Sequence, residues 1–171
     1  MTEPLEPVAE AEDGYRGSEP TAPASIVVER RVEWSDTDAS GVYHNTTVSR
    51  LLETAETLML SDLGLLDEIY GRLPRVRLEL DFRRALRFHD LVEIHLAVAA
   101  VGSSSITYAI EVRRGQEVCV EGTAVAVLID RSDDRPRPWP EAHRRLLLEG
   151  GPQPAERLSR DSGRRRPAPS D

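Results

Sequence analysis

The sequence predicts an α+β domain in which a curled antiparallel sheet surrounds one long helix. Two observations lead to this prediction. Apolar residues recur at helical spacing over only one long stretch, residues 48–63. Four stretches after residue 73 have the patterns of strands, and short turns join them. Such a sheet buries the apolar stripe of a single helix by curling around it.

The chain has 171 residues, a length that fits one domain with a sizeable core. Residues 1–24 and 150–171 are rich in Pro, Gly, Ser and charged residues and poor in apolar ones. Both are therefore expected to be disordered tails. The arginine run at 164–166 lies in the second tail and is expected to be solvated. The folded domain is expected to span residues 25–149.

The ordered part begins with a strand pattern. Residues 26–34 have the composition of a strand, and residues 35–43 form a turn-rich loop around Gly41. The long helix comes next. After it, residues 65–70 are expected to add one extra turn before the strands begin.

The long helix has signals at both of its ends. Asn45, Thr46 or Thr47 can cap its start, because their side chains accept free backbone N–H groups. Gly64 is a natural residue to end it, since glycine adopts the left-handed backbone conformation at low cost. The predicted buried stripe consists of Val48, Leu51, Leu52, Ala55, Leu58, Met59 and Leu63.

The later strands are predicted over residues 76–82, 91–101, 106–112 and 118–129, with a short closing helix over 140–148. In the first of them, apolar and charged residues alternate, which predicts one buried and one solvated face. Its apolar members are Val76, Leu78, Leu80 and Phe82. The last strand is apolar on both faces over 124–129, which predicts a central position in the sheet.

Composition excludes several classes of function. The net charge of −8 argues against nonspecific nucleic-acid binding. No apolar run is long enough to cross a bilayer, and the acidic N-terminus does not resemble a secretion signal. A single cysteine cannot form an internal disulfide, so a cytoplasmic location is expected. All 22 basic residues are arginine, which excludes chemistry that depends on lysine.

Three ionisable residues lie close together before the helix: Asp36, Asp38 and His44. Spacing alone favours a turn or cap for each aspartate, because Asp commonly accepts neighbouring backbone N–H groups there. The alternative for Asp38 is that it faces a ligand. His44 lies where the helix dipole disfavours its cation, so it is either structural or a neutral donor or base.

Other reactive motifs are missing from the sequence. It contains no Gly-x-Ser-x-Gly elbow, no glycine-rich phosphate loop and no paired spacing of metal ligands. Cys119 falls inside a strand pattern and is expected to be a packed residue. Carboxylate chemistry therefore remains, with Asp38 as nucleophile or as general base on water. Glu53 and Glu56 lie on the helix, where they either are solvated or meet another subunit.

Residues 32–56 resemble the opening signature of hotdog-fold acyl-CoA thioesterases of the 4-hydroxybenzoyl-CoA thioesterase type. The family's Asp-x-Asp-x-x-Gly motif corresponds to residues 36–41, and its histidine-containing stretch corresponds to Tyr-His-Asn at 43–45. An acidic residue just before a small one on the helix corresponds to Glu-Thr-Ala at 53–55. The strand pattern is also similar, so the resemblance covers about residues 26–130.

The resemblance implies the hotdog fold, in which an antiparallel sheet of five or six strands curls around one long central helix. Two subunits join edge to edge, and active sites lie between them. Asp38 is implied to be the catalytic carboxylate, and His44 to contact the thioester carbonyl or orient the site. Backbone N–H groups of Asn45, Thr46 and Thr47 are implied to hold the oxyanion.

The activity implied by the resemblance is hydrolysis of an acyl-CoA or acyl-carrier-protein thioester to a free acid and a thiol. The protein is expected to be a cytoplasmic homodimer or homotetramer that binds neither nucleic acid nor membrane. No metal or cofactor is expected, since coenzyme A is part of the substrate. Glu53 and Glu56 are candidate substrate-binding residues. The alternative function is a non-catalytic hotdog module that binds acyl-CoA.

Overall fold

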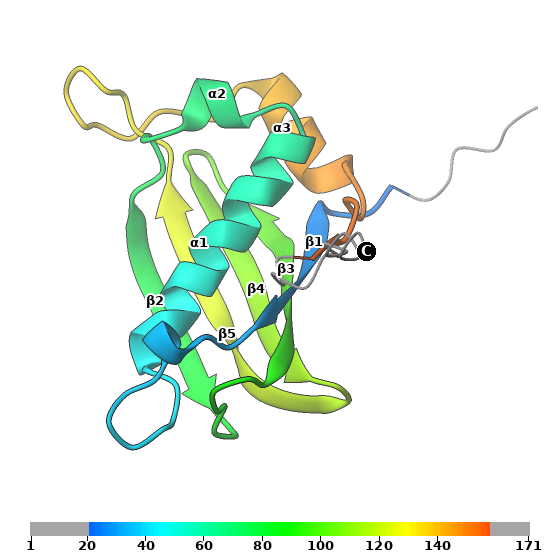
Figure 1. The fold of residues 1–171 in the computed structure, drawn as a ribbon. Helices are drawn as coiled ribbons and strands as arrows, with labels where there is room; N and C mark the ends of the chain where they lie inside the picture. Colours follow the sequence, from blue (N-terminus) through cyan, green and yellow to red (C-terminus); the bar gives the residue numbers. More distant parts are fainter. Residues whose placement is uncertain (1–20, 158–171) are drawn as a thin grey trace, which may run out of the picture.

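The computed structural model of the protein describes residues 21–157. Figure 1 shows a single long helix across a curved sheet, with the smaller helices gathered at one end of it. In chain order the elements are β1 (Ser25–Arg31), the 3-10 turn η1 (Trp34–Asp36), α1 (Asn45–Asp62), α2 (Leu66–Ile69), β2 (Arg75–Phe82), β3 (Leu91–Val101), β4 (Ser105–Arg114), β5 (Glu117–Val127), α3 (Glu141–Glu149) and β6 (Glu156–Arg157).

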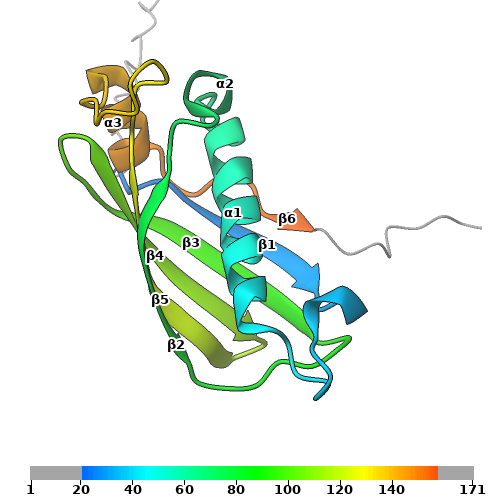
Figure 2. The ribbon, with the colours of Figure 1, turned by 90° about the vertical axis from the view of Figure 1, so that its left-hand side faces the viewer.

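Six strands form one sheet in the order β2-β5-β4-β3-β1-β6. The first five pair antiparallel, and the short β6 adds to β1 in parallel. Figure 2 shows α1 lying along one face of this curved sheet. The predicted α+β fold, with a curled sheet around one long central helix, is confirmed.

The apolar stripe of α1 forms the centre of the core. Its buried members are Val48, Leu51, Leu52, Ala55 and Met59, whereas Leu58 and Leu63 at its margins are partly buried. The helix packs against β3 and β1. Residues spaced three and four apart share one helix face, which is why this spacing in the sequence identified the buried side correctly.

The first strand is shorter than the sequence predicts, since β1 ends at Arg31 and not at residue 34. Two hydrogen bonds turn the chain away from the antiparallel pairing that β1 makes with β3. The N–H of Val32 donates to the carbonyl oxygen of Asp90 (2.8 Å), and the N–H of Glu33 donates to the Asp36 carboxylate (2.9 Å). The chain then turns through η1 into the loop before α1.

The prediction of a half-buried β2 is wrong, because its apolar side chains are largely exposed. The exposed fractions are 60% for Val76, 37% for Leu78 and 49% for Phe82. β2 is the edge strand of the sheet, and α1 packs on β3 and β1 instead. The described elements cover this face only in part: Leu80 packs against the core and Phe82 contacts the ring of Tyr43. An edge strand with this composition is a natural site for pairing with another chain.

β5 has a neighbour on each side, β2 and β4, as its apolar residues on both faces predict. Gly122 in β5 allows β2 to approach closely. A Cβ atom at this position would lie 2.0 Å from the carbonyl oxygen of Glu79 in β2. A larger residue would therefore displace the edge strand.

The sequence predicts a disordered tail from residue 150, but residues 150–157 pack along β1. The Gln153 N–H donates to the carbonyl oxygen of Ser25 (2.7 Å), and Glu156 in β6 lies opposite Val28. Ala24, at the end of the first predicted tail, is also buried. The remaining residues of the two predicted tails, 1–20 and 158–171, lie outside the described part of the chain.

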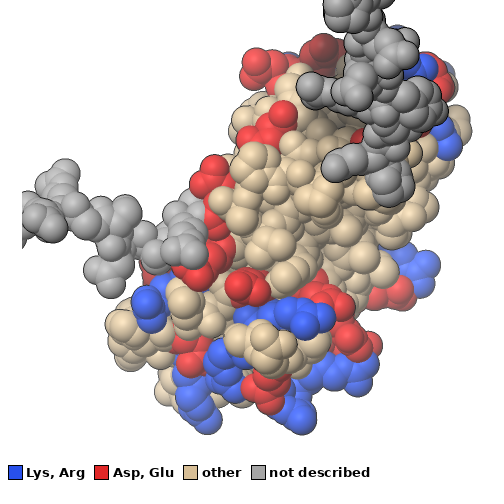
Figure 3. All heavy atoms as spheres, turned by 90° about the vertical axis from the view of Figure 1, so that its right-hand side faces the viewer, with Lys and Arg blue, Asp and Glu red and all other residues tan. Residues whose placement is uncertain are grey.

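Charges of both signs are mixed over the surface. Figure 3 shows arginine and carboxylate side chains intermingled toward the lower end of the face on the right of Figure 1. Ion pairs join Arg114 to Asp90 (2.9 Å) and to Glu117 (2.8 Å), and Arg84 also pairs with Glu117 (2.9 Å). Within residues 21–157, no helix has both the length and the apolar character needed to cross a membrane.

Candidate active site

The loop between η1 and α1 is a tight hairpin that projects beyond the start of the helix (Figure 1). Thr37 and Tyr43 pair across its base. The Asp38 N–H donates to the carbonyl oxygen of Val42 (2.9 Å), and the Gly41 N–H donates to the carbonyl oxygen of Asp38 (3.0 Å). Gly41 has a φ of +73°, which glycine adopts without strain. These bonds hold the Asp38 backbone in place beside the helix start.

Asp38 is exposed, and its carboxylate is held from one side only. The backbone N–H of Ser40 (2.8 Å) and the hydroxyl of Ser40 both donate to Oδ1. These two hydrogen bonds are the largest causes of a pKa of Asp38 that lies below its usual value of 3.8. Oδ2 has no hydrogen-bond partner among residues 21–157. The group is thus ionised at neutral pH with one oxygen free to react.

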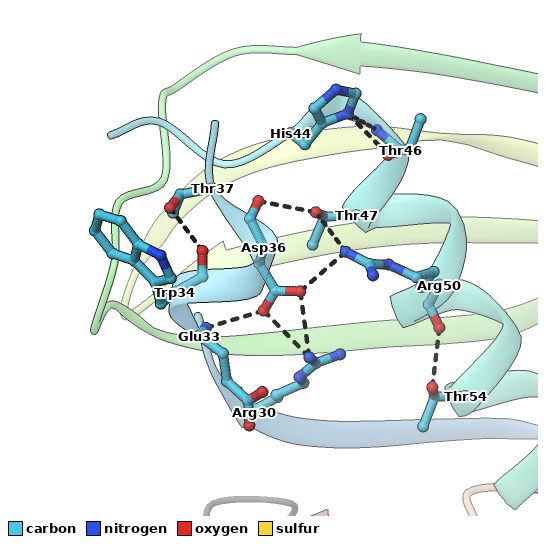
Figure 4. A network of polar contacts seen from close by, with 10 residues as sticks. All are labelled: Arg30, Glu33, Trp34, Asp36, Thr37, His44, Thr46, Thr47, Arg50 and Thr54. Atoms are coloured by element: carbon cyan, nitrogen blue, oxygen red, sulfur yellow. Dashed lines mark hydrogen bonds and ion pairs between the residues drawn. The ribbon is translucent and has the colours of Figure 1, made fainter. Parts of the chain in front are cut away.

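Asp36 is buried, with an exposed fraction of 1%, and every contact it makes is structural. Its carboxylate accepts hydrogen bonds from Arg30 (3.1 Å) and Arg50 (3.2 Å), as Figure 4 shows. Its carbonyl oxygen accepts the N–H of His44 (2.6 Å) and the hydroxyl of Thr47 (3.0 Å). The first acid of the motif therefore ties β1 to α1, which agrees with the turn or cap role favoured by spacing.

The N-cap of α1 is His44, and not one of the three polar residues after it. Nδ1 of His44 accepts the N–H of Thr46 (3.3 Å) and contacts the hydroxyl of Thr46 (2.8 Å), as seen in Figure 4. An N–H can only donate, so Nδ1 carries no proton and the neutral ring bears its proton on Nε2. His44 therefore offers an exposed Nε2–H donor at the helix start.

The backbone N–H groups of the first helical turn differ in their availability. The Thr47 N–H donates to the carbonyl oxygen of His44 (2.9 Å), and the Thr46 N–H is used by the cap. The Asn45 N–H has no acceptor within residues 21–157. It lies at the positive end of the dipole of an 18-residue helix, which is a favourable place for an oxyanion.

A groove lies between the first turn of α1 and the edge strand. We call it the helix-start groove, and its volume is about 310 Å³. It is lined by Asn45, Thr46, Ser49, Leu78, Leu80 and Phe82. Residues at the start of α1 therefore line one wall, and apolar side chains of β2 line the other. Both walls are open to a substrate.

Neither of the two glutamates of α1 lines the helix-start groove. Glu53 is exposed. Glu56 is buried and forms an ion pair with Arg75 (2.7 Å). It lies eleven residues beyond Asn45, which corresponds to about 16 Å along a helix. The structure thus brings Asp38, His44 and Asn45 to the helix start and places Glu56 elsewhere.

Sequence reasoning missed the arginines that hold these acids, Arg30 and Arg50 for Asp36 and Arg75 for Glu56. Each pair joins residues that are 6 to 19 positions apart. Arginines are frequent throughout this chain, so no pattern marks these three. Across residues 21–157, no three His, Cys, Asp or Glu side chains gather in a way that could hold a metal ion.

The fold and the acidic loop before the helix together define a hotdog protein of the thioesterase type. Residues 32–147 match the family model of the thioesterase-like superfamily, and the chain belongs to this family. It is therefore a thioester hydrolase, and the resemblance seen in the sequence is confirmed. No significant match was found among curated proteins.

Solved structures of thioesterases share the fold. A 1,4-dihydroxy-2-naphthoyl-CoA thioesterase from Synechocystis is 21% identical, with a TM-score of 0.65 over 72% of this chain and 95% of that one. A gentisyl-coenzyme A thioesterase is 22% identical, with a TM-score of 0.63 over 70% and 98%. A predicted thioesterase from Bacillus stearothermophilus is 25% identical, with a TM-score of 0.66 over 72% and 94%.

Proposed function

We propose that the protein hydrolyses acyl-CoA thioesters, with Asp38 as the catalytic carboxylate and the Asn45 N–H as the oxyanion donor. One observation carries this proposal. An ionised carboxylate with a free oxygen stands in the loop directly before a helix start whose first N–H has no acceptor among the described residues. A nucleophile or base beside an oxyanion donor is what acyl transfer requires.

The reaction follows from these groups. The thioester carbonyl binds with its oxygen toward the Asn45 N–H, and Asp38 either attacks the carbonyl carbon or takes a proton from a water that attacks it. Negative charge develops on the carbonyl oxygen and is stabilised by the N–H and the helix dipole. When water attacks, the C–S bond then breaks, the acid forms, and the proton taken by Asp38 passes to the thiolate. When Asp38 attacks, loss of the thiolate leaves a mixed anhydride on Asp38; water hydrolyses this anhydride to release the acid and supplies the proton that the thiolate takes up. His44 can donate its Nε2–H to the carbonyl oxygen. No cofactor is needed.

The active form is proposed to be a homodimer in which two β2 strands pair edge to edge. The exposed apolar side chains of β2 support this, since a second copy would cover them and would also satisfy the free edge. The helix-start groove has β2 as one wall. A partner placed there would close the groove and exclude water from it.

Coenzyme A is proposed as the carrier, in part because two of the similar structures are CoA thioesterases. Arg87 is a candidate for binding the CoA phosphates. It pairs with Val42 at the base of the Asp38 hairpin, it is exposed, and its guanidinium has no partner among the described residues. Most other described arginines are engaged by acids or carbonyl groups. The proposal retains the cytoplasmic location expected from the sequence.

Asp38→Asn tests the function directly. We expect this change to lower kcat/KM for a short acyl-CoA by about 10²–10⁴-fold, because the amide is neither a base nor an effective nucleophile. Release of free CoA is the measurement. The melting temperature should stay unchanged, since Asp38 is exposed. Asp62→Asn, an exposed position at the other end of α1, is the matched control. A folded, fully active Asp38→Asn protein would contradict the mechanism.

A further inference from the structure

A group of exposed aromatic side chains lies on the side of the sheet away from β2. It consists of Trp34, Phe88 and His89, and we call it the aromatic corner. The exposed fraction is 72% for Trp34 and 50% for Phe88. Trp34 follows β1 and Phe88 precedes β3, whereas β2 forms the far edge of the sheet. The proposed dimer covers β2 and therefore leaves the aromatic corner open to solvent.

The rings of the aromatic corner meet nearly at right angles. The ring centres of Trp34 and Phe88 are 6.0 Å apart, with an angle of 82° between the planes, and those of Phe88 and His89 are 5.5 Å apart at 85°. Such edge-to-face contacts hold the rings in place without covering both of their faces. Figure 4 shows the Trp34 ring pointing away from Asp36 and from the helix. Trp34 therefore keeps an open face on which a planar group can stack.

The turn that presents Phe88 is strained and firmly held. His89 has a φ of +75°, which is uncommon for a residue other than glycine and occurs often at functional sites. Arg31 donates to the carbonyl oxygen of His89 (2.9 Å) and contacts its Nδ1 (3.0 Å). The N–H of Arg87 donates to the Asp90 carboxylate (2.9 Å), and the N–H of Asp90 donates back to the carbonyl oxygen of Arg87 (3.1 Å). The ring of Phe88 is thus fixed before any ligand binds, which lowers the entropy lost on binding.

Arg87 connects the aromatic corner to the hairpin that carries Asp38. Arg87 pairs with Val42, and the carbonyl oxygen of Val42 accepts the Asp38 N–H (2.9 Å). The path from Asp38 across these two pairings to Phe88 is at most about 15 Å long, because paired residues lie about 5 Å apart and adjacent ones about 3.8 Å. The Arg87 guanidinium is exposed and has no partner among the described residues. The surface therefore presents a carboxylate, a free cation and stacked rings in that order.

We infer that the aromatic corner is a stacking site for the adenine of coenzyme A, an inference that rests on the proposed hydrolysis of acyl-CoA. The adenine stacks on Trp34 and Phe88, as bases stack on exposed aromatic rings, and the diphosphate meets Arg87. The order of groups on the surface matches the order of thioester, diphosphate and adenine along acyl-CoA. The arm of an acyl-carrier protein has no adenine, so the aromatic corner favours CoA thioesters over carrier-protein thioesters.

Tryptophan fluorescence tests whether the aromatic corner binds a nucleotide. The chain has two tryptophans, and Trp139 is buried with an exposed fraction of 6%, so a ligand in solution reaches Trp34. The probe is ADP, and pyrophosphate is the matched probe without a base. We expect ADP to quench the emission of the unmodified protein with saturation, and neither pyrophosphate nor the Trp34→Phe variant to show this quenching. No saturable quenching by ADP up to about 10 mM would overturn the inference.

Two thioesters of the same short acid assign the site to coenzyme A. One is the acyl-CoA, and the other is the N-acetylcysteamine thioester, which lacks the nucleotide. Trp34→Ala should lower the ratio of their kcat/KM values, acyl-CoA over truncated thioester, by about 5- to 100-fold, because the stacking is lost. Tyr70→Ala is the matched control, with an exposed fraction of 68%, and should keep the ratio. A ratio unchanged in both Trp34→Ala and a second variant, Phe88→Ala, would contradict the inference.

Inhibition by ADP separates this inference from its alternatives and from the proposed function. ADP should inhibit hydrolysis of acyl-CoA competitively, and ADP binding without competition would mark a site for a free nucleotide and overturn the assignment to CoA. Slower hydrolysis of an acyl-carrier-protein thioester by Trp34→Ala, with acyl-CoA unaffected, would mark a protein-docking surface and also overturn it. If the unmodified protein hydrolyses neither thioester, the proposed activity is contradicted, whereas saturable quenching by ADP would still support the nucleotide site.

Discussion

Asp36 and Asp38 are two residues apart in one motif, but burial gives them different chemistry. Asp36 is enclosed and neutralised by Arg30 and Arg50, so it has no free oxygen to react. Asp38 projects from a hairpin, and among the described residues only Ser40 donates hydrogen bonds to its carboxylate. The spacing in the sequence does not distinguish them, because both are ordinary turn residues. Their surroundings decide which one is able to act on a substrate.

The pH dependence of hydrolysis should report the lowered pKa of Asp38. The carboxylate is the active form, and a lowered pKa keeps it ionised to lower pH. We therefore expect the acid limb of kcat/KM to have its midpoint below pH 3.8. Ser40→Ala removes the largest cause of the shift, so the limb should move upward toward 3.8. Circular dichroism at each pH confirms that the protein stays folded, and an unmoved limb would exclude Asp38 as the titrating group.

Arg87 is expected to bind the phosphates of coenzyme A. Arg87→Ala should raise KM for acyl-CoA about two- to fivefold and leave kcat nearly unchanged, because an exposed charge pair contributes at most about 1 kcal/mol. Arg145→Ala on α3 is the matched control, since its guanidinium is also exposed and has no partner among the described residues. The effect should weaken at high salt. Equal KM values for the two variants would contradict this role.

At the scale of elements, Asp36 with Arg30 and Arg50, which we call the Asp36 cluster, joins β1, η1 and the start of α1. Asp36→Asn removes the charge that balances Arg30, whose side chain is only 20% exposed. We expect the free energy of unfolding to fall by about 2–4 kcal/mol, because a mostly buried guanidinium is left without its counter-charge. Urea denaturation measures the change. Asp38→Asn is the control and should unfold like the unmodified protein. A loss below about 0.5 kcal/mol would show that the cluster adds little.

The helices and strands themselves were largely predictable from the sequence. Apart from the burial of β2, most of the wrong predictions concern the residues at which an element begins or ends. The α1 stripe and the strands β3 and β4 follow directly from periodicity, which depends on local geometry. The cap at His44 was missed because a histidine rarely fills this position. The early end of β1 depends on contacts with Asp90 and Asp36, which no local pattern reveals.

At the scale of the whole molecule, the exposed face of β2 predicts how two copies assemble. Leu78→Asp should convert the dimer to a monomer and abolish hydrolysis, because edge pairing would bury a charged aspartate from each subunit among apolar side chains. Light scattering during size-exclusion chromatography measures the mass. Leu146→Asp on α3 is the control, with an exposed fraction of 39% against 37% for Leu78. A Leu78→Asp protein that keeps both mass and activity would disprove this interface.

The sequence by itself determined the fold class, the long helix with its buried stripe, and the loop of acids at the helix start. These features depend on residue type and on short-range spacing, which the linear pattern records. Only the tertiary structure decided that β2 is an exposed edge, that His44 caps the helix and that the Asn45 N–H has no acceptor within residues 21–157. It also brought Trp34 and Phe88 together from two distant segments. Burial and long-range pairing depend on which elements meet in space, and the order of residues along the chain does not record that.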